Sequence, residues 1–133
     1  SEMCIRDRAQ EERDHAMMMR KYLLDNGIRV TFDAIAKPDK EYKCHTCPLQ
    51  AGLEHEQYVT SLISAIYKEA SAQNDYKTMQ FLDWFIKEQV EEEKNAEDLL
   101  KKMKLFGGDS KGLYMLNQEL NARVYTPSAN LNN

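Results

Sequence analysis

Three long segments of the chain repeat apolar residues with the period of an α-helix, and each also carries acidic residues on its apolar side. They run from Gln10 to Asn26, from Leu49 to about Gln73 and from Tyr76 to about Phe106. A short fourth helix is expected from Lys111 to about Ala122. No segment shows the strict alternation that indicates a half-buried β-strand. The pattern therefore predicts an all-α fold.

The connection between the first two helices runs from Ile28 to Pro48 and has no helical period. It is about 20 residues long, whereas connections in compact domains usually have only a few residues. A long crossover between two parallel helices of a bundle is one arrangement that requires such a connection.

The composition excludes several classes of protein. A net charge of -4 over 133 residues, with no basic stripe, argues against a general nucleic-acid binder. No apolar run approaches the roughly 20 residues of a membrane span, and the N-terminal run SEMCIRDRAQ lacks the apolar region of a secretory signal. Three cysteines, an odd number, favour a reducing compartment over a disulfide framework, so we expect a cytoplasmic protein.

The third segment has the densest run of acidic residues. At about 100° per residue, its large apolar residues fall on one side of the helix. Most of the glutamates interrupt that side, whereas Glu93 and Val90 are predicted to point away from it. The polar residues on or beside the apolar side are Glu88, Gln89, Glu91 and Glu92, among Phe81, Trp84, Phe85, Leu99 and Met103.

The other two long segments show the same feature. Glu56 is the one acidic residue in the middle of the apolar stripe of the second helix. In the first helix, Glu12 and His15 are three residues apart, and they are therefore neighbours on the face that carries Met19. Glu11 lies on the edge of that face.

Ionised carboxylates inside a core are too costly to persist without partners. No Lys or Arg falls on these inner faces, which leaves raised pKa values or metal ions. Carboxylate and imidazole ligands suit iron or manganese, with zinc as a further option. A Glu-x-x-His pair on one helix with single glutamates on others is typical of di-iron carboxylate bundles. Solvated faces or hydrogen-bonded acids are the simpler interpretation, but three such faces together favour a metal site.

Four motifs resemble those of the bacterial non-haem ferritins, over a stretch from about Ala9 to about Ala122. EERDHA is similar to the second-helix motif of that family, EHEQYV to its third-helix motif and FLDWFIKEQVEEEK to its fourth-helix motif. GLYMLNQEL is similar to the short terminal helix. The resemblance implies a ferritin-like four-helix bundle with a long crossover and a short C-terminal helix.

The resemblance also implies a function: oxidation of Fe(II) with oxygen or peroxide at a non-haem di-iron site, and storage of the mineral in a homo-oligomeric shell of 24 subunits. By motif position, Glu12 bridges the two irons, His15 binds one iron and Glu56 binds the other. Gln89 belongs to the oxygen-binding region. An additional iron site corresponds to Glu11, Glu88, Glu91 and Glu92, and Glu92 is a candidate for sharing between sites.

Two related families differ from this chain at motif positions. Bacterioferritins bind haem through a methionine directly after the bridging glutamate, where this chain has Arg13, so no haem is expected. Bacterioferritins and rubrerythrins also carry a second Glu-x-x-His in the late helix. The equivalent spacing here ends in Glu91.

A ferritin subunit begins with a long first helix that supplies one more glutamate ligand, and no segment here resembles it. We therefore expect residues 9–133 to be a partial ferritin-like domain of three long helices and a short one. Residues 1–8 are expected to be non-native or disordered. Under this interpretation one iron of the ferroxidase site lacks a terminal ligand.

The run CHTC places Cys44, His45 and Cys47 in the predicted crossover. Three soft ligands within four residues are able to bind zinc or copper if another subunit supplies a fourth. Without a second C-x-x-C, an incidental loop is the favoured interpretation.

Two other functions stay open at this point. One is a related di-metal oxidase or peroxide-detoxifying bundle without large-scale storage. The other is a non-enzymatic helical scaffold whose inner acids are only hydrogen-bonded. The match from Gly112 to Leu120 favours a cage, because small di-iron bundles have no need of a terminal helix.

Overall fold

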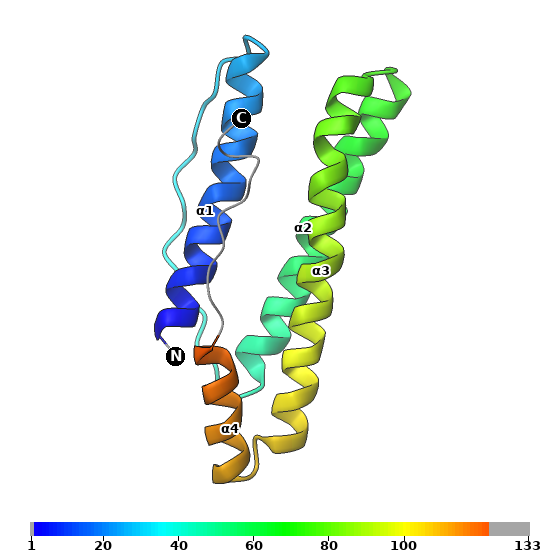
Figure 1. Cartoon of the computed structure of the whole chain (residues 1–133). Helices are drawn as coiled ribbons and strands as arrows, with labels where there is room; N and C mark the ends of the chain where they lie inside the picture. The colour runs from blue at the N-terminus through cyan, green and yellow to red at the C-terminus, as the bar shows by residue number, and fades with distance from the viewer. Residues whose placement is uncertain (1, 123–133) are drawn as a thin grey trace. The chain divides into compact units, whose positions relative to one another are not determined.

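The computed structural model describes residues 2–122, and its helices confirm the all-α prediction. These are α1 (Glu2–Asp25), α2 (Cys47–Ala72), α3 (Tyr76–Phe106) and α4 (Ser110–Asn121), and no strand occurs in this part of the chain (Figure 1). None of the described helices is long and apolar enough to cross a membrane.

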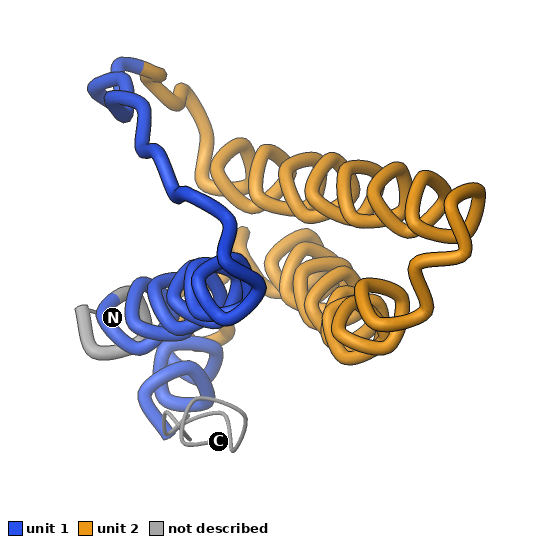
Figure 2. The backbone as a smooth tube through the Cα atoms, turned by 90° about the horizontal axis from the view of Figure 1, so that it is seen from above, with its two compact units in different colours: residues 1–39, 114–133 blue, residues 40–113 orange. Residues whose placement is uncertain are grey.

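The chain divides into two compact units (Figure 2). Residues 40–113 form one unit, which contains α2 and α3. Residues 1–39 and 114–133 form the other, which contains α1. The predicted centre therefore draws its residues from both units.

Helix α1 ends as the run DNG predicts. Gly27 adopts a left-handed conformation with φ of 70°, and its N–H donates to the carbonyl oxygen of Leu24 at 2.9 Å. The N–H of Ile28 donates to the carbonyl oxygen of Leu23, also at 2.9 Å, which is the pattern of a Schellman cap. At its other end, α1 begins at Glu2 rather than at Gln10.

Helices α2 and α3 form an antiparallel hairpin (Figure 1). The turn between them places Asn74 at φ of 56°, and Asp75 is the N-cap of α3. The Asp75 carboxylate accepts hydrogen bonds from the Thr78 main-chain N–H at 3.1 Å and from the Thr78 hydroxyl at 2.5 Å. These bonds lower the pKa of Asp75, because they favour its ionised form.

The core of the hairpin is a set of apolar side chains at helical spacing. Phe85 is only 3% exposed, and its ring lies 4.9 Å from the Trp84 ring in an edge-on arrangement and 5.2 Å from the Phe81 ring. The buried apolar residues of the pair are Leu53, Ile63 and Ala70 on α2 and Leu82, Phe85 and Leu100 on α3. This periodic core sets which polar residues of the two helices meet.

The connection from α1 to α2 has no helix, as predicted, but its cysteines differ from expectation. Helix α2 begins at Cys47 rather than Leu49, and Cys47 forms a disulfide with Cys44. The odd number of cysteines favoured a reducing compartment over a disulfide framework, and it gave no indication of this bond. The two cysteines are three positions apart, at the point where the loop meets the helix.

Candidate metal centre

The interface of α2 and α3 contains a polar cluster of four residues: Glu56 and Thr60 on α2, and Gln89 and Glu93 on α3. The two residues on each helix are four positions apart, so they lie on the same face of that helix. Gln89 is 6% exposed, and its amide nitrogen Nε2 has three acceptors within hydrogen-bonding distance. These are the Glu56 carbonyl oxygen at 3.2 Å, Glu56 Oε2 at 3.3 Å and Thr60 Oγ1 at 3.3 Å.

Glu92 lies next to this cluster in sequence and is 5% exposed, the lowest value among the acidic residues whose burial the structure describes. The prediction that it points into the core is confirmed. A carboxylate this buried is stable only if it is paired, hydrogen-bonded or bound to a metal. Glu88, one turn earlier, is half-buried.

The prediction that Glu93 points away from the buried face is wrong. The Thr60 hydroxyl donates to Glu93 Oε1 at 2.5 Å, so Glu93 faces α2 and does not point away from the interface. Glu91, expected on or beside the buried stripe, is exposed. The physical reason is that α3 has apolar residues on more than one side. The buried face of α3 holds Phe85, Gln89 and Glu92. The prediction defined that face by the large apolar residues, among them Phe81 and Trp84, which turned it toward Glu91 and away from Glu93.

Helix α1 brings Glu12 and His15 together as predicted, with His15 Nδ1 3.7 Å from Glu12 Oε2. The distance is too long for a hydrogen bond but places imidazole and carboxylate side by side. Their exposure differs, since 58% of the Glu12 side chain and 16% of the His15 side chain are accessible. Glu11 is half-buried.

The buried acid of α1 is Asp14, which the sequence analysis missed. Asp14 is 8% exposed and accepts a hydrogen bond from Gln10 Nε2 to Oδ1 at 2.8 Å. The available signal was its spacing: Asp14 lies four residues before Met18, which is 6% exposed. Glu12, expected on the inner face, is instead an exposed residue.

The structure thus groups the predicted site residues, which are the iron ligands and Gln89, by unit. Glu12, His15 and Glu11 belong to the unit of α1, and Glu56, Glu88, Gln89, Glu91 and Glu92 belong to the unit of α2 and α3. Among the described residues, no three His, Cys, Asp or Glu side chains are arranged to hold a metal ion. The chemistry of the donor set still suits iron, because it consists of carboxylates and one imidazole.

A second polar contact joins the hairpin away from this cluster, between Tyr67 on α2 and Asp83 on α3. Partial burial, the charge of Asp83 and a hydrogen bond to its carboxylate raise the pKa of Tyr67 above its usual value. The phenol therefore stays protonated at neutral pH and serves as a donor.

Comparison with known proteins assigns the fold. The chain belongs to the ferritin-like family, since the ferritin-like domain matches residues 3–106. The expectation drawn from the four motifs is therefore confirmed, and so is the fold class.

Three curated relatives illustrate the similarity. The chain is 34% identical over 112 residues to a probable bacterial non-heme ferritin-like protein of Haemophilus influenzae, covering 84% of this chain and 68% of that protein. It is 34% identical over 116 residues to the bacterial non-heme ferritin of Escherichia coli O157:H7, and the match covers 87% of this chain and 70% of that protein. It is 37% identical over 120 residues to the bacterial non-heme ferritin of Staphylococcus saprophyticus, covering 90% and 72%.

Solved structures agree with this assignment. A humanized archaeal ferritin superposes with a TM-score of 0.90 at 37% identity, over 93% of this chain and 75% of that one. An engineered closed form of the Archaeoglobus fulgidus ferritin superposes with a TM-score of 0.88 at 36% identity, over 92% of this chain and 75% of that one. Both values indicate the same fold.

Proposed function

We propose that this protein stores iron, by oxidising Fe(II) to Fe(III) at a di-iron carboxylate site and depositing the product as mineral inside a multi-subunit shell. Membership of the ferritin-like family supports the proposal, as do relatives named bacterial non-heme ferritin. The same kinship supports a homo-oligomer and a cytoplasmic location as parts of the proposal.

The observation that carries the proposal is the polar cluster inside the α2–α3 interface. Glu56 and Gln89 are bonded to each other across two helices that also pack through apolar side chains, and buried Glu92 lies one position from the cluster residue Glu93. A helical scaffold gains nothing from burying carboxylates, because desolvating them is costly. A site for a hard, positively charged ion does require them.

The proposed roles follow from donor chemistry. Glu12 would bridge two irons, His15 would bind one of them and Glu56 the other, with ferrous iron as the substrate. Gln89 would fix the Glu56 carboxylate through its N–H and present its amide to oxygen or peroxide. Glu11, Glu88, Glu91 and Glu92 would form the additional iron site, and exposed Glu91 is its least buried member on α3.

Reduction of one oxygen molecule to peroxide, or of one peroxide to water, takes two electrons. Each ferrous ion supplies one of them. Carboxylate oxygens favour Fe(III) over Fe(II), because they are hard, anionic ligands. The protein therefore contributes binding, orientation and charge, and iron carries the redox chemistry.

The test is Fe(II) loading in air, followed by size-exclusion chromatography with iron measured in each protein fraction. Iron that elutes with a very large particle supports storage, and iron on a small oligomer would support a di-metal oxidase instead. Protein that stays free of iron in every fraction contradicts the proposal.

A matched pair of variants ties the activity to the site. Glu56→Ala should slow the initial oxidation of Fe(II) by at least about tenfold, because it removes a ligand. Glu54→Ala is the control, since Glu54 is exposed on the same helix and accepts only the local bond from Gln50 that the structure describes, at 3.1 Å. Equal rates for the two variants would contradict the role of Glu56.

A further inference from the structure

The Cys44–Cys47 disulfide lies where the crossover enters α2. Cys47 is the first residue of the helix, and Cys44 is exposed. The bond closes a very short loop, so it removes much less entropy from the unfolded chain than a long-range bridge would. Stabilisation of the fold is thus a weak reason for its presence. In the cytoplasm proposed above, disulfides that form are usually transient and chemically active.

The two sulfur atoms differ in their surroundings. The main-chain N–H of Cys47 donates to Cys44 Sγ at 3.0 Å, and the Thr46 hydroxyl oxygen is 3.4 Å from the same sulfur. The sulfur of Cys44 therefore accepts a hydrogen bond from an amide at the start of a helix, where the helix dipole favours negative charge. Both interactions stabilise a thiolate at Cys44 when the bond opens.

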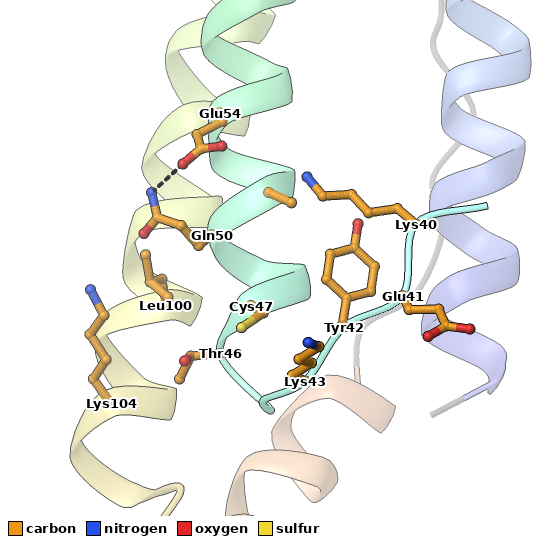
Figure 3. A pocket seen from close by; sticks show the side chains of 11 residues that line it. Lys40, Glu41, Tyr42, Lys43, Thr46, Cys47, Gln50, Glu54, Leu100 and Lys104 are labelled. Carbon is orange, nitrogen blue, oxygen red and sulfur yellow. Dashed lines mark hydrogen bonds between the residues drawn. The ribbon is translucent and has the colours of Figure 1, made fainter. Parts of the chain in front are cut away.

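A pocket of about 510 Å³ adjoins the disulfide, within the unit of residues 40–113. Figure 3 shows Cys47 at the start of α2 with Tyr42 of the crossover on one side and Leu100 and Lys104 of α3 on the other. Lys40, Lys43 and Lys104 line it. Of its two glutamates, Glu41 points away from the pocket in Figure 3, and Glu54 accepts a bond from Gln50. Both glutamates keep their charge, so three lysines against two glutamates give the lining a formal charge of +1.

From these observations we propose that Cys44 and Cys47 form a reversible redox site, which exchanges with a low-molecular-weight thiol that carries carboxylate groups. The pocket holds this anionic thiol beside Cys47. The site is separate from the candidate metal centre, and no step of iron oxidation depends on it.

Atoms and electrons balance in this exchange. The incoming thiolate attacks Cys47 Sγ, the Cys44–Cys47 bond breaks, and Cys44 leaves as the thiolate that the Cys47 N–H stabilises. A better-stabilised leaving group leaves faster, which favours attack at Cys47. A second thiol then attacks the external sulfur of the mixed disulfide and releases Cys47. Two external thiols are oxidised to one disulfide, and the protein gains two thiols with their protons.

Reversibility is tested on the full chain with Cys4→Ser, so that only the pair is counted. The protein is equilibrated in mixtures of reduced and oxidised glutathione, quenched in acid and labelled with a maleimide for mass spectrometry. Two labels in excess reduced glutathione, and none after oxidised glutathione is restored, support the proposal. A bond that persists in excess reduced glutathione, or thiols that fail to close again, would overturn it.

The thiolate at Cys44 is tested with single-cysteine variants in the same background. Cys44 in Cys47→Ser should react with iodoacetamide at pH 6 about tenfold faster than Cys47 in Cys44→Ser, because a stabilised thiolate is present at lower pH. Thr46→Val should reduce this advantage, and circular dichroism checks that each variant keeps its helices. Equal rates for the two cysteines would overturn the assignment.

The pocket is tested by comparing an anionic thiol with a neutral one. The double variant Lys40→Gln, Lys104→Gln should slow reduction by glutathione about two- to fivefold at low salt and leave reduction by 2-mercaptoethanol unchanged. Lys68→Gln is the matched control, since exposed Lys68 is on α2 but does not line the pocket. No change with glutathione, or an equal change with both thiols, would overturn the selection for an anionic thiol.

Discussion

The amide of Gln89 on α3 binds both the main chain and the side chain of Glu56 on α2, with Nε2 3.2 Å from the carbonyl oxygen and 3.3 Å from Oε2. A helix carbonyl normally accepts only from its own helix. The contact therefore joins two helices at one residue and orients a proposed iron ligand.

Gln89→Leu tests this contact. Leucine keeps most of the volume but removes both donors, so we expect the initial rate of Fe(II) oxidation to fall about tenfold. Gln57→Leu is the control, because Gln57 is exposed and adjacent to Glu56 in sequence. A stopped-flow measurement of ferric absorbance gives the rates, and an unchanged rate in Gln89→Leu would contradict an orienting role.

The Thr60–Glu93 hydrogen bond should stabilise the hairpin, since it joins two helices and its acceptor is a carboxylate. Thr60→Val should lower the free energy of unfolding by about 1–2 kcal/mol, and Thr60→Ser should lower it much less because the hydroxyl remains. Urea titration at one protein concentration measures both. Equal losses would mean that the methyl group contributes as much as the hydroxyl, and would contradict a dominant role for the hydrogen bond.

Phe85 is the most informative core position, because it is buried and packs against two aromatic rings. Phe85→Ala should lower the free energy of unfolding by about 3–5 kcal/mol, through lost burial and the cavity that remains. Ile86→Ala, at a neighbouring residue that is 37% exposed, should cost less than about 1.5 kcal/mol. Similar values in urea titrations would contradict the burial pattern.

Replacing Gly27 by alanine should lower the stability of the protein, whereas replacing Gly52 by alanine should raise it. Gly27 has φ of 70°, so Gly27→Ala should destabilise the protein by about 1 kcal/mol. Gly52 lies inside α2, and a methyl group added there would meet no atom within 4 Å apart from its chain neighbours and the nearby backbone of its own helix, so Gly52→Ala should stabilise the protein by about 0.5–1 kcal/mol. Thermal unfolding of both variants is the measurement, and a shift of the same sign would refute the conformational argument.

The N-cap of α3 should make stability depend on pH. The pKa of Asp75 is lowered in the folded state, so its contribution is present above the unfolded pKa and is lost as pH falls through the folded pKa. Asp75→Ala should therefore lower the melting temperature by several degrees near neutral pH, and by less below about pH 4. A difference that is constant from pH 7 to pH 3 would show that the charge of Asp75 is unimportant.

Local features of the fold were predictable because they depend on neighbours in the chain. The end of α1 at Gly27 requires only a residue that tolerates positive φ, and Glu12 meets His15 because positions three apart share a helix face. The motif from Phe81 to Lys94 identified the family for a similar reason, since its residue types and spacing are read directly from the chain.

The candidate site was predicted less completely. Glu56, Gln89 and Glu92 were placed on inner faces, and the structure agrees for all three, with Glu56 half-buried. Glu91 was predicted to lie by the buried face and Glu93 to point away from it, and the structure shows the opposite. A helical wheel averages all apolar residues of α3 and contains no information about which side packs against α2. Residues two positions apart lie about 160° apart around the helix axis, so a buried face turned toward Glu93 is turned away from Glu91.

The sequence by itself determined that there are four helical segments, that α1 ends at a cap formed by Gly27, and which kinds of side chain are available as iron ligands. These features follow from short-range geometry and residue chemistry. Only the tertiary structure decided that Gln89 bonds to Glu56 and that Glu93 bonds to Thr60. Both contacts bring together residues 33 positions apart, and packing of apolar side chains between α2 and α3 sets their register.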